Sequence, residues 1–479
     1  MMRYKQRPIR IGGLLLLLHL LLLSPASAQR VKVPSEPAAL SQSFWTLSIQ
    51  DAESGQELVG IRSHHLATPA STMKLISTAT LWSQKGGGLR IPTEIHTTGT
   101  IAQGKLEGDL YIVGHGDPSI GSRYFWNSDQ DRFFKEVASA LKAKGITQIK
   151  GNIIALSPES DFQAVNPRWI AYDMGNAYAP GLWSLNAYDN SYALHFSHYG
   201  KSYEVSPAVP ELKLQKAYQI TSSRSRDSLY ISPFPHPDGS YDITGAYPER
   251  IEKLRVRAAL PNPPLFVADR LRQVCQGAGI EVAGEARVVR HLPPETQLLF
   301  TYQSAPLRTL IQITLHYSHN LFAEGLLRQL TWDKAPRPGH NATQTAIEEV
   351  HRYWSSRGIN TRELEMMDGS GLSPENRVSA YFLATMLGKI ERADPSGSFR
   401  SLLPRAGMEG TLSHFLKGTP LQGKARLKSG TLRNVICYAG YVEIEGHTYT
   451  VALMVNNFYG SSSTIRRAME DILLSAFGY

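Results

Sequence analysis

Ser71-Thr-Met-Lys74, at the start of a segment whose apolar residues recur at helical spacing up to Trp82, is the stretch that decides the fold. Pro69 lies just before it, and proline suits the start of a helix. We therefore expect Ser71 in the first turn of a largely buried helix. Residues i and i+3 share a helix face, so the amine of Lys74 can lie beside the hydroxyl of Ser71. Lysine can take the proton of that hydroxyl if burial and a nearby positive charge, here Lys428, lower its pKa.

A second motif, Ser318-His-Asn320, begins another segment with helical periodicity. A hydroxyl and an amide two residues apart can both enter a cleft only where the backbone is not yet regular helix. We expect Ser318 to relay a proton to a leaving amine and Asn320 to bind a substrate amide. The alternative is an ordinary helix cap, because serine and asparagine favour helix starts.

A third motif, Lys428-Ser-Gly430, interrupts a strand-like run. Lys428 would supply positive charge for a substrate carboxylate, and Ser429 would supply a hydroxyl. Glycine inside a strand indicates close approach of another backbone, here that of a ligand. The backbone N–H groups of Thr431 and Ser71 would then form an oxyanion hole. The alternative is a lysine on an exposed edge strand.

Two other segments imitate these motifs. Ser139-Ala-Leu-Lys142 has the spacing of the first motif, but it ends an amphipathic helix just before Gly145, where lysines usually face solvent. Ser184-Leu-Asn186 imitates the second motif. Order along the chain and local context favour Ser71 and Ser318.

Residues 1–28 are predicted to be a secretory signal peptide with cleavage before Gln29. A basic start is followed by an apolar run over 14–23 and by Ala26-Ser-Ala28. The alternative is a membrane anchor, but the run is shorter than the ~20 residues that a spanning helix needs. We expect an exported protein without a transmembrane span, most simply in the periplasm of a Gram-negative bacterium.

The composition is that of a globular protein with ordinary hydrophobic and charged content, 42% and 19%. The net charge of +9 falls to +5 without residues 1–28, which hold four basic and no acidic side chains. This excess favours anionic surfaces such as cell-wall polymer or lipid headgroups, and hence loose membrane association, although a solvated surface without a partner fits equally well. No basic cluster with interleaved aromatics suggests nucleic acid.

The two cysteines, Cys275 and Cys437, are too few for a disulfide scaffold or a multi-thiolate zinc site. We expect both in the core and leave their pairing open. The sequence has no H-E-x-x-H motif, and we expect neither a metal nor a cofactor.

The strand signals lie at the two ends of the chain. They fall at 44–63, 425–431, 436–443 and 448–456, and a last helix follows at 462–477. We therefore expect one α+β domain whose antiparallel sheet joins both ends. The region between Ser71 and Ser318 is too long for a loop. Its sequence predicts a mixed α and β insert. Within that insert, the stretch from Tyr192 to Asp242 is polar and has no helical pattern, which indicates a second, nested insert.

All three motifs, in this order around an inserted region, make the chain resemble the D-alanyl-D-alanine carboxypeptidase/endopeptidases, the class C low-molecular-mass penicillin-binding proteins. The likeness includes Gly108-Asp-Leu-Tyr-Ile-Val-Gly-His-Gly-Asp-Pro118, Asp368-Gly-Ser-Gly-Leu-Ser373 and Leu403-Pro-Arg-Ala-Gly-Met-Glu-Gly-Thr-Leu412. The segment from Trp169 to Asn186 also resembles that family, and so the likeness covers nearly the whole mature chain.

The resemblance implies a penicillin-binding transpeptidase-like (serine β-lactamase-like) catalytic domain with an antiparallel sheet flanked by helices, plus two nested insert domains. The expected limits are 29–91 with 295–479 for the catalytic domain, 92–186 with 253–294 for the first insert, and 187–252 for the nested β-rich insert. The oligomeric state and the role of the nested insert stay open.

The resemblance also implies the chemistry. Ser71 would be acylated by D-Ala-D-Ala peptides or cross-links of peptidoglycan and deacylated by water, with β-lactams as covalent inhibitors. Lys74 would be the proton acceptor, and Lys428 the contact of the substrate carboxylate. Asp173 would accept the amino group of a diaminopimelate side chain. Two alternatives are a noncatalytic peptidoglycan-binding or penicillin-sensing protein and a serine β-lactamase.

Overall fold

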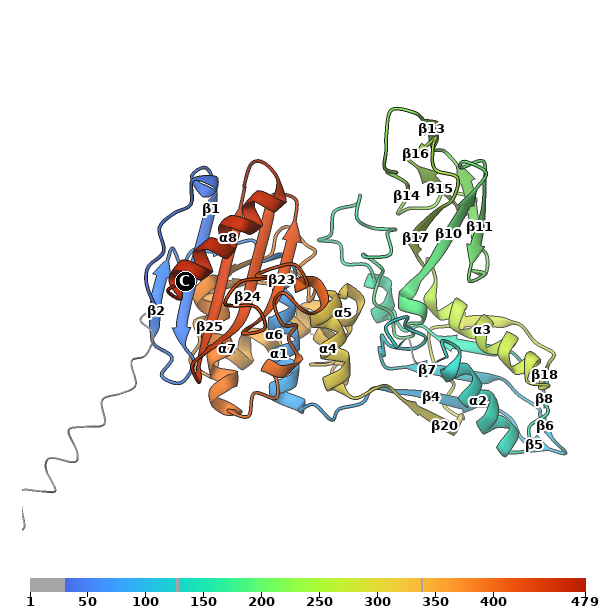
Figure 1. Cartoon of the computed structure of the whole chain (residues 1–479). Coiled ribbons are helices and arrows are strands. Elements are labelled where there is room, and N and C mark those ends of the chain that lie inside the picture. Colours follow the sequence, from blue (N-terminus) through green and yellow to red (C-terminus); the bar gives the residue numbers. More distant parts are fainter. Residues whose placement is uncertain (1–30, 126–128, 337–338) are drawn as a thin grey trace, which may run out of the picture.

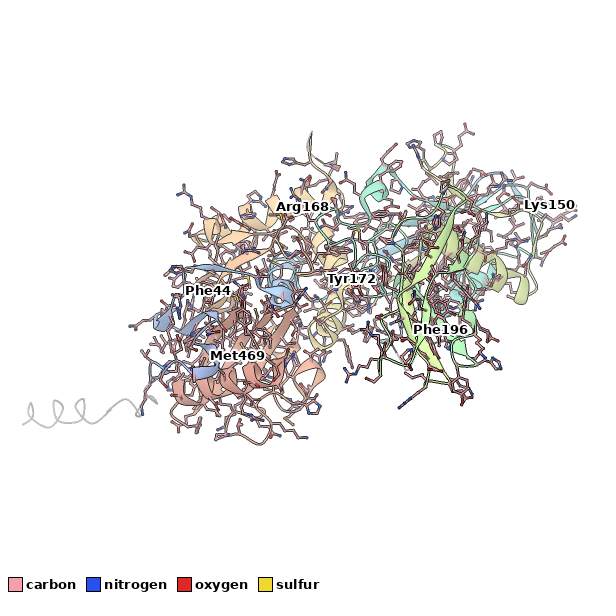
Figure 2. All side chains as sticks on the ribbon, turned by 90° about the horizontal axis from the view of Figure 1, so that it is seen from above. Phe44, Lys150, Arg168, Tyr172, Phe196 and Met469 are labelled. Carbon is pink, nitrogen blue, oxygen red and sulfur yellow. The ribbon has the colours of Figure 1, made fainter. Side chains whose placement is uncertain are left out.

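The computed structural model describes residues 31–125, 129–336 and 339–479. The chain forms two lobes (Figure 1). The terminal lobe contains both ends of the described chain, and the inserted lobe consists of the residues between α1 (Met73–Lys85) and α4 (Leu307–Tyr317). Figure 2, from above, shows Phe44 and Met469 in the terminal lobe, Phe196 and Lys150 in the inserted lobe, and Tyr172 between them. The predicted signal peptide, 1–28, lies outside the described residues.

The terminal lobe is built on a five-stranded sheet in the order β2-β1-β25-β24-β23. All neighbours in this sheet are antiparallel, and Trp45 near one end of the chain lies opposite Val455 near the other. This confirms the expected sheet that joins both ends. Its strands are β1 (Phe44–Asp51), β2 (Glu57–Ile61), β23 (Ala425–Leu432), β24 (Val435–Ile444) and β25 (His447–Asn456).

Alternation along β24 explains why helices cover both faces of this sheet. Cys437 and Ala439 lie in one apolar cluster with helices of one face, whereas Tyr438 and Val442 lie in a second cluster with α8 (Ser462–Ala476). A small sheet, β21-β22-β3, lies beside the first cluster (Leu364–Glu365, Arg377–Ser379 and Leu66–Ala67). The helices of the first face are α1, α4, α5 (Asn320–Arg328), α6 (Ala342–Ser355) and α7 (Ala380–Ala393).

The inserted lobe is joined to the terminal lobe by two adjacent strands. The chain enters through β4 and returns through β20, and these strands are paired antiparallel in a sheet of order β19-β9-β7-β4-β20. Helices α2 (Arg132–Ala143) and α3 (Pro263–Gly277) pack on this sheet through one apolar cluster. The strands are β4 (Pro92–Thr97), β7 (Leu110–Gly114), β9 (Ile153–Leu156), β19 (Ala286–Val289) and β20 (Gln297–Gln303).

Short strands complete the lobe. A four-stranded sheet of order β18-β8-β6-β5 lies at its edge (Glu281–Val282, Gln148–Ile149, Lys105–Leu106 and Ile101–Ala102). The nested part contains no α-helix between residues 191 and 262, all of which are described, as its polar composition predicts. Its sheets are β11-β10-β17, β12-β15-β14 and β13-β16, with β10 (Ser191–Ser197), β11 (Ser202–Ser206), β12 (Lys213–Lys216), β13 (Gln219–Thr221), β14 (Tyr230–Ile231), β15 (Ser240–Thr244), β16 (Ala246–Pro248) and β17 (Leu254–Ala259).

Strand pairing shifts two of the expected domain limits. The limit at 295 assigns β20 to the catalytic domain, yet β20 pairs with β4 of the insert. The limit at 253 assigns β17 to the first insert, yet β17 pairs with β10 of the nested part. Both differences arise because a strand that leaves an insert also completes its sheet. We propose that the catalytic domain resumes after Gln303 and the first insert after Ala259.

The two cysteines lie in different cores, Cys275 in the inserted lobe and Cys437 in the terminal lobe. Both are buried and free, as the core prediction requires, so they do not pair. Within the described residues, no helix has the length and apolar character required to cross a membrane.

Candidate active site

Ser71 and Lys74 lie where a short 3-10 turn, Ala70–Thr72, runs directly into α1. This confirms the predicted position of Ser71 at the first turn of a buried helix. Lys74 is 0% exposed, and its Nζ lies 2.9 Å from Ser71 Oγ. The same Nζ also donates to Asn320 Oδ1 at 2.6 Å and to the carbonyl of Ser370 at 2.5 Å. A base is thus in contact with the hydroxyl that it would activate.

Burial lowers the pKa of Lys74 to about 7, against the opposing charges of Asp368 and Glu324. The expected effect of burial is therefore confirmed. The charges that act most on Lys74 are those of the carboxylates Asp368 and Glu324, which raise this pKa, where the sequence pointed to the positive charge of Lys428. The pKa of Lys428 is itself held well below its usual value, first by burial and then by repulsion from Lys74.

The second motif spans the junction of two helices. Ser318 ends α4 in the left-handed conformation, with φ 57°, and Asn320 begins α5. The backbone is thus irregular at the motif, as expected. The helix cap of α5 is His319, whose Nδ1 accepts a hydrogen bond from the N–H of Phe322. The alternative interpretation, that Ser318 or Asn320 serves as the side-chain cap of this helix, is therefore wrong.

The third motif lies on β23, at the edge of the sheet. Lys428 is nevertheless 0% exposed, so the alternative of a solvated edge lysine is wrong. Its Nζ donates to Ser318 Oγ at 3.0 Å and to the carbonyl of Ser429 at 2.5 Å. The hydroxyl of Ser429 donates to Thr411 Oγ1 at 2.7 Å. The second and third motifs are therefore joined by a lysine to serine contact.

Gly430 brings the third motif against the first. A Cβ at this position would lie 2.6 Å from the carbonyl oxygen of Pro69 and 3.0 Å from the backbone nitrogen of Ser71. The sequence predicted that the backbone of a ligand approaches this glycine. In the structure, the backbone that approaches it is that of Pro69 and Ser71. The next residue, Thr431, is exposed, and its Oγ1 accepts from Arg466 at 3.4 Å.

Asp173 lies at the rim of the site. Its Oδ1 accepts a hydrogen bond from the hydroxyl of Tyr178 at 2.8 Å, and the carbonyl of Tyr178 accepts one from Asn320 Nδ2 at 2.6 Å. The segment begins at Trp169, whose Nε1 donates to Asp368 at 2.8 Å. A segment of the inserted lobe therefore reaches the motifs of the terminal lobe.

Two buried carboxylates that the motif analysis did not single out, Glu324 and Asp368, act on the pKa of Lys74. Glu324 accepts hydrogen bonds from the N–H groups of Gly369 and Ser370, at 3.1 and 2.9 Å. Burial and the charge of Asp368 raise the pKa of Glu324, whereas the hydrogen bonds from Ser370 and Gly369 and the charge of Lys74 lower it. The signal available in the sequence was one glutamate among the apolar residues of 321–327, where a charge is costly to bury.

Neither imitation of the motifs belongs to this site. Ser139 and Lys142 are exposed on α2, as predicted for a solvated helix face. Ser184 and Asn186 are buried within the inserted lobe, where Ser184 Oγ donates to Asp161 at 2.7 Å. Their role there is structural.

The chain is similar along almost its whole length to proteins of one kind. It is 25% identical to a D-alanyl-D-alanine carboxypeptidase of an Actinomadura species, over 91% of this chain and 82% of that protein. It is 23% identical to the D-alanyl-D-alanine carboxypeptidase DacB of Haemophilus influenzae, over 78% and 77% of the two chains.

Solved structures show the same fold. The crystal structure of penicillin binding protein 4 from Haemophilus influenzae matches with a TM-score of 0.78 at 20% identity, over 93% of this chain and 98% of that one. A predatory peptidoglycan endopeptidase from Bdellovibrio bacteriovorus matches with a TM-score of 0.53 at 14% identity, over 91% and 92%. The expected penicillin-binding transpeptidase-like fold is thereby confirmed.

A family model settles the relationship, because it spans residues 28–475 and so includes all three motifs and both inserts. That span confirms the expected class of serine-type peptidase: the chain belongs to the D-Ala-D-Ala carboxypeptidase 3 (S13) family.

Proposed function

We propose that this protein hydrolyses D-Ala-D-Ala peptides and D-Ala-containing cross-links of peptidoglycan through an acyl-enzyme on Ser71. The observation that carries this proposal is the contact of 2.9 Å between Ser71 Oγ and the buried Nζ of Lys74. A pKa of about 7 leaves a substantial fraction of Lys74 neutral at neutral pH. A neutral amine can accept the proton that serine must lose.

The partners of Lys74 direct its lone pair. A neutral amine carries two hydrogens, and two acceptors besides Ser71 lie within reach, the side-chain oxygen of Asn320 and the carbonyl of Ser370. When these take both hydrogens, the lone pair faces Ser71 Oγ and accepts its proton. The oxygen then attacks the carbonyl carbon of the penultimate D-Ala.

The leaving amine needs a proton as the peptide bond breaks. Ser318 is suited to this relay, because its Oγ lies 3.0 Å from the donor Nζ of Lys428. Water afterwards attacks the ester, its oxygen stays on the released acid, and its proton returns to Ser71 Oγ. The proton that Lys74 took from Ser71 replaces the one that Lys428 gave through Ser318, which restores the enzyme. The backbone N–H groups of Ser71 and Thr431 are proposed to stabilise the oxyanion, and the close approach at Gly430 supports this.

Substrate contacts are assigned to the same cleft. Lys428 and Ser429 would bind the terminal carboxylate, and Asn320 the peptide amide. Asp173 would accept the amino group of a diaminopimelate side chain, which its position beside Tyr178 supports. The exported, periplasmic location and loose association with the membrane are part of this proposal.

Covalent inhibition by β-lactams follows from the same nucleophile. The Haemophilus protein has been solved with a bound β-lactam, and the Bdellovibrio endopeptidase as a penicillin G acyl-enzyme. A strained lactam carbonyl would acylate Ser71 as the peptide does.

The test is to incubate the purified protein with a D-Ala-D-Ala peptide and with cross-linked muropeptides, and to follow D-Ala release and cross-link cleavage by mass spectrometry. Ser71→Ala should abolish both reactions and labelling by a fluorescent penicillin. Labelling without any turnover would instead indicate a penicillin-sensing protein. Labelling of Ser71→Ala would overturn the proposed nucleophile.

A further inference from the structure

We propose that Asp189 of the inserted lobe is a positioning residue, which fixes the catalytic second motif through a contact with His319. This inference rests on the proposed function and extends it, because it makes acylation at Ser71 depend on the inserted lobe.

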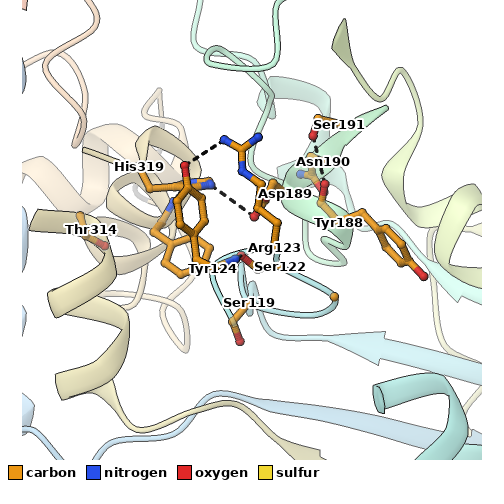
Figure 3. A network of polar contacts seen from close by, with 12 residues as sticks. Ser119, Ser122, Arg123, Tyr124, Tyr188, Asp189, Asn190, Ser191, Thr314 and His319 are labelled. Carbon is orange, nitrogen blue, oxygen red and sulfur yellow. Dashed lines mark hydrogen bonds and ion pairs between the residues drawn. The ribbon is translucent and has the colours of Figure 1, made fainter. Parts of the chain in front are cut away.

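The contact joins the two lobes at the second motif. His319 Nε2 lies 3.3 Å from Asp189 Oδ1, and the two side chains are only 8% and 3% exposed (Figure 3). His319 stands between Ser318 and Asn320, and each of these contacts a lysine of the site. A movement of His319 would therefore move two catalytic side chains together.

The imidazole of His319 is held from several sides. Its Nδ1 caps α5 by accepting from the N–H of Phe322 at 3.4 Å. The ring of Tyr124, from the inserted lobe, meets the imidazole edge to face with centroids 5.0 Å apart, and the ring of Phe322 lies 4.5 Å away. With Nδ1 at the N–H of Phe322, Nε2 3.3 Å from Asp189 Oδ1 and two aromatic rings against it, the imidazole has one defined orientation.

Asp189 is itself held in an unusual turn. Its φ is 58°, and the residues on either side, Tyr188 and Asn190, are also left-handed. Asn190 fixes the turn, because its Nδ2 donates to Gly181 O at 2.9 Å and to Asn186 Oδ1 at 2.7 Å. Successive left-handed residues are costly and persist where the surroundings determine them.

The charge on Asp189 is stabilised despite its burial. Burial alone would raise its pKa, but contacts with His319 and Ser122 and the charge of Arg123 hold the pKa below its usual value. Arg123 Nε and Arg257 Nη2 lie 3.6 and 3.7 Å from Asp189 Oδ2. A buried carboxylate therefore faces His319.

The geometry explains why the second motif needs such support. Ser318 is left-handed, a conformation that is unfavourable for a residue other than glycine. Nothing in the sequence of 316–320 favours this conformation. The contact from Asp189 to the adjacent residue supplies an external restraint on it, and small displacements of catalytic groups are expensive in rate.

The test compares Asp189→Asn, His319→Ala and the double variant in acylation by a fluorescent penicillin. Asparagine tolerates the left-handed conformation, so Asp189→Asn keeps the turn while it removes the charge. We expect the acylation rate constant of Asp189→Asn to fall at least tenfold, with the dissociation constant of the noncovalent complex changed less than threefold. If the two residues act through each other, the double variant loses no more than His319→Ala.

Asp242→Asn is the matched control. It removes the carboxylate of another aspartate to histidine contact in the inserted lobe, 2.9 Å from His236 Nε2, away from the motifs. It should change acylation less than twofold. Independent losses that multiply in the double variant, or an unchanged rate in Asp189→Asn, would overturn the inference.

A second measurement separates this inference from the proposed function. Amide hydrogen exchange of the peptide 316–324 should accelerate in Asp189→Asn and stay unchanged in Asp242→Asn, whether or not the protein has activity. Unlabelled wild-type protein would contradict the proposed function alone. Unchanged exchange at 316–324 in Asp189→Asn would contradict the positioning role alone.

Discussion

Lys74 is tied to Ser370 by a hydrogen bond of 2.5 Å from its Nζ to the backbone carbonyl. Residues 368–371, which supply this carbonyl, are in turn held by the carboxylates of Glu324 and Asp368. The orientation of the proposed base is thus set by groups behind it as well as by the serine in front.

Lys74→Arg should reduce acylation by roughly 10²- to 10⁴-fold, the usual contribution of a general base. The guanidinium keeps a positive charge but does not lose a proton near neutral pH. Time courses of fluorescent penicillin labelling measure the rate. A rate within a few-fold of the wild type would show that another group takes the proton of Ser71.

The acylation rate should rise with pH through about 7. Lys74 has a folded-state pKa of about 7, so it is protonated and inactive as a base below that pH and neutral above it. The measurement is the second-order acylation rate between pH 5 and 9 with a penicillin, whose own charge is constant there. A rate that falls over this range would contradict the role of a neutral lysine.

Glu324→Gln should move the acidic limb of that profile to lower pH. The negative charge of Glu324 raises the pKa of Lys74, so its removal lowers this pKa. Stability should also fall by about 1–3 kcal/mol, because one amide oxygen replaces two oxygens that accept from Gly369 and Ser370.

Glu391→Gln provides the control for that variant. Glu391 lies on α7, and its Oε1 is 3.4 Å from Nη2 of Arg400. Among the described residues, no hydrogen bond or ion pair joins it to the three motifs. It should alter stability without a shift of the pH profile. A profile that is identical in Glu324→Gln and the wild type would remove Glu324 from the functional site.

Gly430→Ala should reduce penicillin labelling at least tenfold. The new Cβ would meet the backbone of Pro69 and Ser71 at 2.6 and 3.0 Å and push β23 away from the nucleophile. Gly88→Ala is the matched control, because a Cβ there meets no atom within 4 Å. Equal labelling of both variants would show that the close approach of the first and third motifs is unimportant.

Ser139→Ala should leave peptide hydrolysis and penicillin labelling unchanged. Ser139 and Lys142 share the spacing of Ser71 and Lys74 but lie exposed on α2. The assay is D-Ala release at saturating peptide, alongside a thermal unfolding curve that checks the fold. Loss of labelling with normal unfolding would move the nucleophile to this helix.

The sequence predicts the site where chemistry depends on short local patterns. The spacing of Ser71 and Lys74 and the irregular backbone at Ser318 are visible without a structure. Glu324 and Asp368 could not be assigned a role, because their partners are set by folding: Lys74 and Ser370 are 296 positions apart. The expected domain limit at 295 missed strand β20 for the same reason, because β20 pairs with β4 across the whole length of the insert.

The pairing of β1 with β25 has a consequence for the order of folding. Residues 44–51 must wait for 447–456 before their sheet can close, whereas the inserted lobe between them completes its sheets from its own contiguous residues. Distant pairings are slow to form. As the polypeptide is made from its N-terminus, the inserted lobe is therefore able to fold first, and the sheet of the terminal lobe closes only when the last strands arrive.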